Sequence, residues 1–183
     1  CAWDCGEWGD VYSDSELTKE AASLLEVEYD KNVFYPEHGV STLTPYIAKY
    51  FPNAKVCAIA VNGEPPVNMK DAKKLTEVLA PFFTKEKQKE NFLLISTDFS
   101  HHGNTEQTER KDLKSAQFMA APQPENWILC SCDNRPGIYA MAHIFAEEGA
   151  GQKKISVLYH TNSFELSGKD EDDITSYFFT FMY

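Results

Sequence analysis

Two short apolar runs constrain the fold of this chain more than any other feature. Residues 55–61 and 92–95 are continuous, rich in β-forming residues and far too short to span a bilayer. Segments with apolar residues at helical spacing alternate with these runs, which is the pattern of α/β proteins. The sequence therefore predicts one α/β domain over 1–183, with a central mixed β-sheet covered by helices on both faces.

The spacing of apolar residues also predicts the surrounding elements. A helix over 14–26 is predicted because Ser13-Asp-Ser-Glu16 offers N-cap and first-turn acidic residues, and a second over 40–51 carries Pro45 near its start. Pro136 and Gly149 mark the two ends of a helix over 135–149. Further helices are expected over 68–83 and 105–121, and strands over 55–61, 92–96, 154–159 and 175–183.

The charge balance excludes some classes of partner. There are 28 Asp and Glu against 17 Lys and Arg, so the formal net charge is -11. This charge repels phosphate backbones and anionic lipids, so we expect no binding to nucleic acid or to a membrane. The five cysteines form no even framework and no signal peptide is recognised, which favours a reducing, cytoplasmic location.

The first residue, Cys1, is not an initiator methionine. Two alternatives follow. Cys1 is either the acylated terminus of a processed bacterial lipoprotein, or an interior residue of a longer polypeptide of which this is a part.

The strongest candidate site lies directly after the second apolar run. The segment Asp98-Phe-Ser-His101-His102-Gly103 gathers one carboxylate and two imidazoles where a buried strand ends, which is where open α/β sheets place their sites. Histidine acts as acid, base or metal ligand near neutral pH, and a nearby aspartate orients it. The alternative is a capping cluster in which Asp98 and Ser100 satisfy backbone amides.

Two weaker candidates precede predicted helices. Glu37 and His38 either cap a helix or point into a cleft. Cys130 and Cys132 lie just before the helix that begins near Arg135, where a thiolate has a depressed pKa and can bind a soft metal. Burial of both thiols in the core is the alternative.

Two single histidines complete the candidates. His143 lies on the predicted helix over 135–149 and is expected to be a packing residue. His160 ends a predicted strand and is assigned no role.

These motifs, in this order, resemble the Memo family, which includes AmmeMemoRadiSam system protein B. Residues 36–46 resemble the family's Glu-His-Ser-x-Glu stretch, and 96–103 resemble its Ser-Ser-Asp strand end with the following histidine. Residues 132–137 resemble its Cys-Gly-x-x-Pro helix entry. Residues 159–168 and 175–177 resemble its closing Tyr-x-x-Ser and Ser-Tyr-Ala strands.

The resemblance implies a fold similar to the class III extradiol dioxygenases and a cleft metal, iron or copper. By position, Cys132 matches the cysteine ligand, His101 the histidine beside the metal and Asp98 its supporting aspartate. Glu37 and His38 match a pair at the cleft border. The family's Pro-His-Ala-Gly-Tyr and Gly-Pro-Ser/Asn-His motifs, which carry its two histidine ligands, do not occur here, so we expect an N-terminal part to be missing.

Two functions from different classes remain open at this point. In the first, the chain belongs to a metal-dependent, oxidoreductase-type enzyme that acts on a small-molecule substrate. In the second, it is a non-catalytic Memo-like module that binds a partner, or associates with itself through an uncovered sheet edge, and needs no metal.

Overall fold

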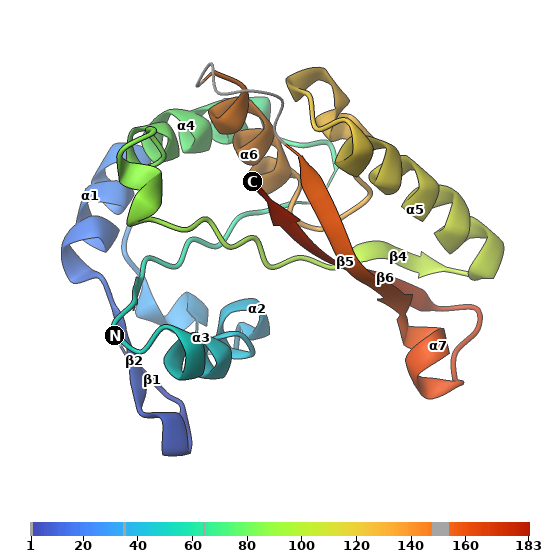
Figure 1. The fold of residues 1–183 in the computed structure, drawn as a ribbon, viewed down its shortest axis with the longest axis horizontal. Helices are drawn as coiled ribbons and strands as arrows, with labels where there is room; N and C mark the ends of the chain where they lie inside the picture. The colour runs from blue at the N-terminus through green and yellow to red at the C-terminus, as the bar shows by residue number, and fades with distance from the viewer. Residues whose placement is uncertain (1, 35, 64, 148–153) are drawn as a thin grey trace. The chain divides into compact units, whose positions relative to one another are not determined.

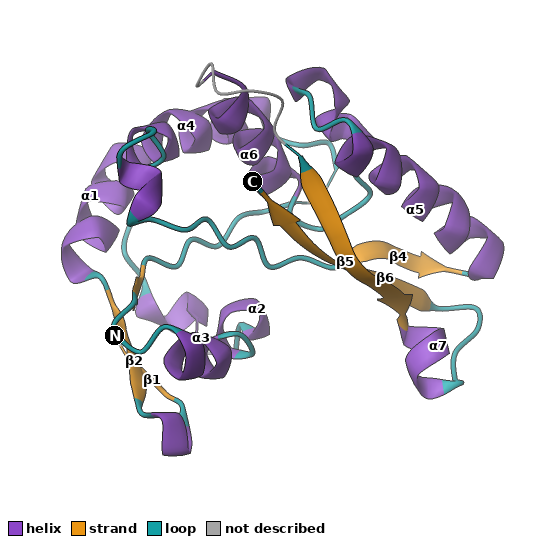
Figure 2. Ribbon diagram, in the orientation of Figure 1, coloured by secondary structure: helices purple, strands orange, loops and turns teal. Residues whose placement is uncertain are grey.

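The computed structural model describes residues 2–34, 36–63, 65–147 and 154–183, so Cys1 and Gly149 lie outside the described residues. The chain divides into two compact units, Cys1–Ala60 and Val61–Tyr183, here called unit 1 and unit 2. The single domain expected over 1–183 stays a prediction. Helices and small sheets occur in both units, so the expected mixture of α and β structure is confirmed (Figures 1 and 2).

The described residues of unit 1 form one small sheet and three α-helices. Strands β1 (Ala2–Asp4) and β2 (Asp10–Ser13) pair antiparallel, and β3 (Lys55–Val56) joins β2 in parallel. Helix α1 (Ser15–Leu25) begins where the Asp14 carboxylate accepts from the Leu17 amide at 3.0 Å. Helices α2 (His38–Ser41) and α3 (Thr44–Tyr50) replace the single helix predicted over 40–51, and Pro45 lies in the first turn of α3.

Unit 2 holds a second sheet with the strand order β4-β6-β5. Strands β5 (Ile155–Asn162) and β6 (Ile174–Met182) run antiparallel side by side, as Figure 1 shows, and match the two strands predicted near the C-terminus. Strand β4 (Phe99–Gly103) pairs with β6. Helix α7 (Ser163–Ser167) lies between β5 and β6 in the sequence.

Three long helices of unit 2 were predicted by the spacing of their apolar residues. They are α4 (Met69–Leu79), α5 (Thr105–Ala120) and α6 (Arg135–Glu147). Helix α5 packs against all three strands of the second sheet, α6 joins the core beside it, and α4 packs against α6. Asn104 and Gln107 form a capping box at the start of α5. The main core cluster joins side chains of β4, α5 and α6 with the segment between the two helices; its fully or nearly fully buried members are Phe99, Phe118, Met119, Cys130, Cys132, Ile138 and Ala142.

The two apolar runs do not form the central sheet that was predicted from them; the described strands form two separate three-stranded sheets. Only residues 55–56 of the first run belong to a strand, and among the described residues none of 92–97 does. The second run is the extended loop that leads into β4 (Figure 2). A strand needs a hydrogen-bonded neighbour as well as an extended backbone. Although the ring of Phe92 stacks on that of Phe181 in β6, no described strand pairs with 92–97.

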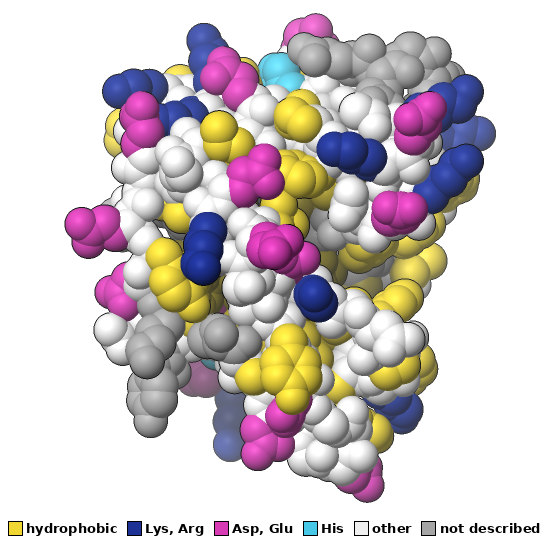
Figure 3. Space-filling view, turned by 90° about the vertical axis from the view of Figure 1, so that its left-hand side faces the viewer, with side chains coloured by type: hydrophobic (Ala, Val, Ile, Leu, Met, Phe, Trp, Pro, Cys, Tyr) yellow, Lys and Arg dark blue, Asp and Glu magenta, His cyan; other side chains and the backbone are white. Residues whose placement is uncertain are grey.

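The surface carries both signs of charge. On the face shown in Figure 3, acidic and basic side chains are interspersed, with hydrophobic side chains between them. None of the described helices is long and apolar enough to cross a lipid bilayer.

Candidate metal site

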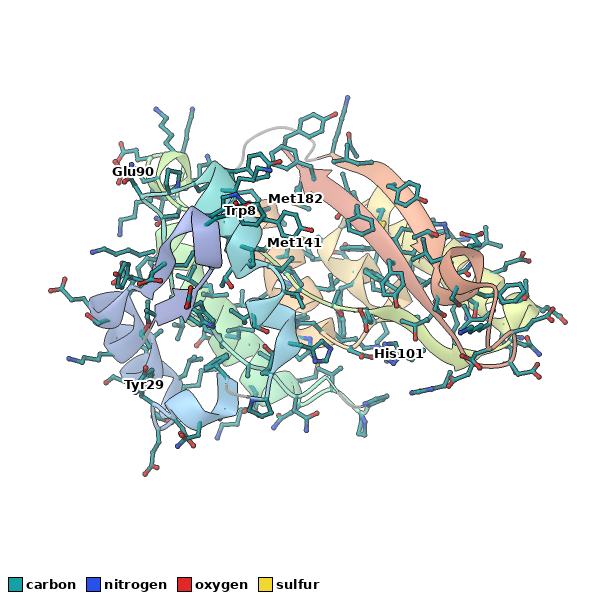
Figure 4. All side chains as sticks on the ribbon, turned by 90° about the horizontal axis from the view of Figure 1, so that it is seen from below. Trp8, Tyr29, Glu90, His101, Met141 and Met182 are labelled. Carbon is teal, nitrogen blue, oxygen red and sulfur yellow. The ribbon has the colours of Figure 1, made fainter. Side chains whose placement is uncertain are left out.

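Three side chains of unit 2 converge at the start of β4. His101 Nε2 lies 3.3 Å from Asp98 Oδ2 and 3.2 Å from Asp133 Oδ2. Figure 4 labels His101, whose side chain lies beside the yellow-green ribbon of β4. We call Asp98, His101 and Asp133 the triad; one ligand atom from each lies within 4.8 Å of the others. The structure thus brings together Asp98 and His101 of the sequence prediction and adds Asp133.

Backbone hydrogen bonds hold the two halves of the triad together. The Asp133 amide donates to the Asp98 carbonyl at 3.0 Å, and the Ser100 amide donates to the Ser131 carbonyl at 2.9 Å. The Asn134 amide donates to Thr97 Oγ1 at 2.9 Å. The segment before α6 is therefore fixed against the segment that enters β4, although the two are more than thirty residues apart in the sequence.

The imidazole of His101 is in an unusual position. Its side chain is 28% exposed, but the Nε2 atom itself is buried and makes no hydrogen bond to the described residues. The two carboxylate oxygens lie at ion-pair distance without hydrogen-bond geometry. A buried imidazole nitrogen without a hydrogen-bond partner, together with two carboxylates, is a set of groups that fits a divalent cation.

A phenol borders the triad. Burial raises the pKa of the Tyr177 hydroxyl above its ordinary value, and the negative charge of Asp98 raises it further. Tyr177 therefore keeps its proton at neutral pH.

Comparison with known proteins identifies the family at this point. A family model described as Memo-like protein matches residues 5–178. The chain belongs to the Memo-like family.

Curated relatives of this family are similar over almost the whole chain. A MEMO1 family protein of Metallosphaera sedula is 24% identical and covers 97% of the chain, and one of Pyrobaculum aerophilum is 28% identical and covers 91%. The Memo-like chain spans 64% and 61% of the lengths of these two relatives. No solved structure is a significant match.

Cys132, the predicted cysteine ligand of this Memo-like chain, lies outside the triad. Its side chain belongs to the apolar core cluster and is 7% exposed. Burial raises the pKa of the thiol to about 11, against hydrogen bonds from Thr97 and the Asn134 backbone that lower it. The prediction that the start of α6 lowers the pKa of this thiol was therefore wrong, because desolvation raises the pKa by more than nearby groups lower it. Its role as a ligand stays a prediction.

Cys132 is expected to resist alkylation in the folded protein. With a pKa of about 11, roughly one thiol in a thousand is ionised at pH 8, and only the thiolate reacts. The neutral thiol also stabilises the fold, and this contribution is lost as the pH rises from about 8.5 through the raised pKa. Mass spectrometry after iodoacetamide treatment at pH 8, with and without urea, compares the alkylation of Cys132 in the unfolded and the folded protein. Rapid modification of folded Cys132 would contradict the burial argument.

Glu37 and His38, the predicted pair at the cleft border, lie in unit 1. Glu37 caps α2, because its carboxylate accepts from the amides of Gly39 at 2.6 Å and Val40 at 2.9 Å. The His38 carbonyl accepts from Thr42 Oγ1 at 2.7 Å. The capping alternative therefore describes the local role of Glu37, and a role of either residue in a site stays a prediction.

The remaining histidines have structural partners. His143 Nδ1 lies 2.8 Å from the Tyr139 carbonyl, and the two rings stack, so its predicted packing role is confirmed. His160 Nε2 lies 2.9 Å from Oδ2 of Asp112, a buried carboxylate on α5. Sequence reasoning missed Asp112 and Asp133. Asp112 had one available signal, since it is a charged residue on the face of α5 that also carries Thr108 and Ser115.

Gly63 lies against the backbone of the triad. A Cβ atom at this position would overlap the Asp133 carbonyl oxygen. We expect Gly63→Ala to displace Asp133 and to weaken cation binding about 10-fold, within the range seen when the support of a ligand is disturbed. Titration with cobalt(II) measures the effect. Gly168→Ala controls for general destabilisation, because its Cβ would contact nothing but its φ of 66° disfavours alanine. Equal affinities would contradict the expectation.

Proposed function

We propose that unit 2 binds one divalent transition-metal cation at the triad, and that the Memo-like protein is a metal-dependent oxidoreductase. The observation that carries this proposal is the buried, unbonded Nε2 of His101 between two carboxylate oxygens. A small-molecule substrate is part of the proposal, as are a cytoplasmic location and the likeness to class III extradiol dioxygenases. Because the chain spans less than two thirds of its relatives, the activity is proposed for the whole protein.

Iron(II) fits the donor set of the triad better than copper does. One imidazole and two carboxylates are borderline and hard ligands, whereas copper(I) favours thiolates. The thiol of Cys132 lies in the apolar core cluster and is not among the ligand atoms that converge in the triad. When bound, iron would supply Lewis acidity and electron exchange.

The residues of the chain have separate tasks in this proposal. Asp98 and Asp133 balance the charge of a cation, and His101 completes the donor set. Tyr177 holds a proton beside the Asp98 carboxylate, where it can donate a hydrogen bond to an anionic substrate group. A largely apolar cavity of about 360 Å³, whose lining includes Phe99, Ile138 and Phe178, adjoins β4 and is large enough for a small-molecule substrate.

Metal binding tests the proposal directly. The purified protein is weighed by intact mass spectrometry and analysed for iron and copper, and the metal-free form is titrated with cobalt(II), whose visible spectrum reports its ligands. We expect one ion per chain. Asp98→Asn and Asp133→Asn should each weaken binding about 10-fold or more, because each removes a charged donor.

Asp173→Asn is the matched control. Asp173 is exposed and contacts His102 at 2.7 Å, one residue beyond the triad histidine. Its replacement removes the same charge from the same region but no proposed ligand. Absence of saturable binding, or equal weakening by the control, would overturn the metal proposal. A spectrum with a strong thiolate band would move the site towards Cys132 and copper.

A second candidate function is a binding module without catalysis, in which the chain associates with itself or a protein partner through a sheet edge. The observation that favours it is the exposure of β5, an edge strand of the sheet. Val157, Leu158 and Tyr159 are consecutive and 43%, 72% and 56% exposed. Exposed apolar edge strands pair with other chains unless charge or distortion prevents it.

Leu158→Lys tests this alternative, because a charge on the edge strand blocks such pairing. Analytical ultracentrifugation should show a wild-type dimer or larger species and a monomeric variant. A wild-type chain that is monomeric at every concentration would rule out self-association through β5.

A further inference from the structure

Strand β4 departs from the alternation of a regular strand. In regular β-structure residues two apart share a face, so His101 would lie on the same face as Phe99, inside the core. Phe99 and Ser100 are instead both buried, at 4% and 1% exposure. His101 follows them on the side of Asp98. Because Phe99 and Ser100 are both buried, the alternation of faces shifts by one residue, and the side chain of His101 points to the triad instead of the core.

The backbone records the same departure. Ser100 and His102 have φ angles of 45° and 53°, in the left-handed region that favours glycine. Between the pairs Phe99–Ser176 and Gly103–Ile174, β4 advances four residues while β6 advances two. This is a bulge, a feature that re-aims side chains next to functional sites.

A buried carboxylate holds the bulge. Ser100 Oγ donates to Asp112 Oδ1, and Ser176 Oγ on β6 donates to the same oxygen at 2.6 Å. His160 on β5 contacts the other oxygen, Oδ2, at 2.9 Å. Asp112 is 6% exposed and is linked to all three strands of the sheet. Left-handed residues other than glycine persist where their surroundings fix them in this way.

The neighbouring residue on α5 holds the histidine itself. Lys111 Nζ donates to the His101 carbonyl oxygen at 2.7 Å. Adjacent side chains of one helix thus fix adjacent residues of the bulge, Ser100 through its hydroxyl and His101 through its backbone.

We propose that Ser100 is a positioning residue: its left-handed conformation, held by Asp112, turns His101 towards Asp98 and Asp133 and so forms the cation site. This inference rests on the proposed metal function and deepens it. It assigns the assembly of the site to a serine and an aspartate that touch none of the proposed ligand atoms.

Three variants separate positioning from general stability. Ser100→Ala loses the hydrogen bond to Asp112 while its Cβ still disfavours a left-handed backbone, so the bulge should relax and cobalt(II) affinity should fall about 10-fold or more. Ser100→Gly loses the same bond, but glycine adopts the conformation freely, so affinity should stay within about 3-fold of wild type. Ser176→Ala is the matched control: it loses a bond to the same Asp112 oxygen but lies on β6, opposite the bulged strand, and its affinity should also stay within about 3-fold.

A second readout needs no metal. The ring-proton NMR signals of His101 in the metal-free protein should shift in Ser100→Ala and stay in place in Ser176→Ala. If both variants alter the signals equally, or if Ser100→Gly loses as much affinity as Ser100→Ala, the positioning role is overturned. If wild type binds no cobalt(II), the metal proposal fails, and the NMR comparison still decides whether Ser100 orients His101.

Discussion

His101→Ala is expected to weaken cobalt(II) binding by about 100-fold or more, because it removes the one nitrogen donor of the triad. Two carboxylates would remain at the site, and they hold a transition metal less tightly than a set that includes imidazole. Titration of the metal-free variant, followed by its visible spectrum, measures the loss.

His102→Ala is the control for that experiment. The two histidines are adjacent and their rings lie edge to face, with centroids 5.2 Å apart. The side chain of His102 is 77% exposed, however, its Nδ1 contacts Asp173, and it supplies no ligand atom to the triad. We expect its affinity to stay within about 3-fold of wild type. Comparable losses in the two variants would mean that the cation binds elsewhere, and the triad would lose its proposed role.

Phe118→Ala is expected to destabilise the protein by about 3–5 kcal/mol, the usual cost of removing a large buried aromatic side chain. Phe118 is 1% exposed and lies in the core cluster that joins β4, α5 and α6. The cost combines lost burial with the cavity left behind. Urea denaturation followed by circular dichroism gives the change in the free energy of unfolding.

Leu113→Ala is the matched control on the same helix. Leu113 is 66% exposed, and alanine is a strong helix former. We therefore expect a change within about 0.5 kcal/mol. If Phe118→Ala also fell in this range, the packing of α5 against the core would be wrong.

The predicted helices succeeded where local signals define them. Asp14, Asn68 and Asn104 each cap the first turn of a helix through a side chain two or three residues away. The prediction of one continuous helix over 40–51 was wrong, because the chain turns between Ser41 and Thr44 and forms two helices. Start signals span a few residues and can be read locally, whereas an interruption depends on what the helix packs against.

The predicted site was incomplete for a related reason. Asp98 and His101 are three residues apart, so their proximity followed from the sequence. Asp133 joins them only because the segment before α6 is hydrogen-bonded to the segment that enters β4. The bulge at Ser100 was equally hidden, since it requires Asp112 on another element.

The sequence by itself determined the family, the three long helices of unit 2, its two C-terminal strands and the pairing of Asp98 with His101. The tertiary structure alone decided that Asp133 completes the triad, that Cys132 is buried and protonated, and that no described strand pairs with the run over 92–97. The physical reason is the distance along the sequence over which each interaction acts. Spacing and capping act within one or two turns of chain, whereas desolvation, strand pairing and ligand convergence depend on segments that only folding brings together.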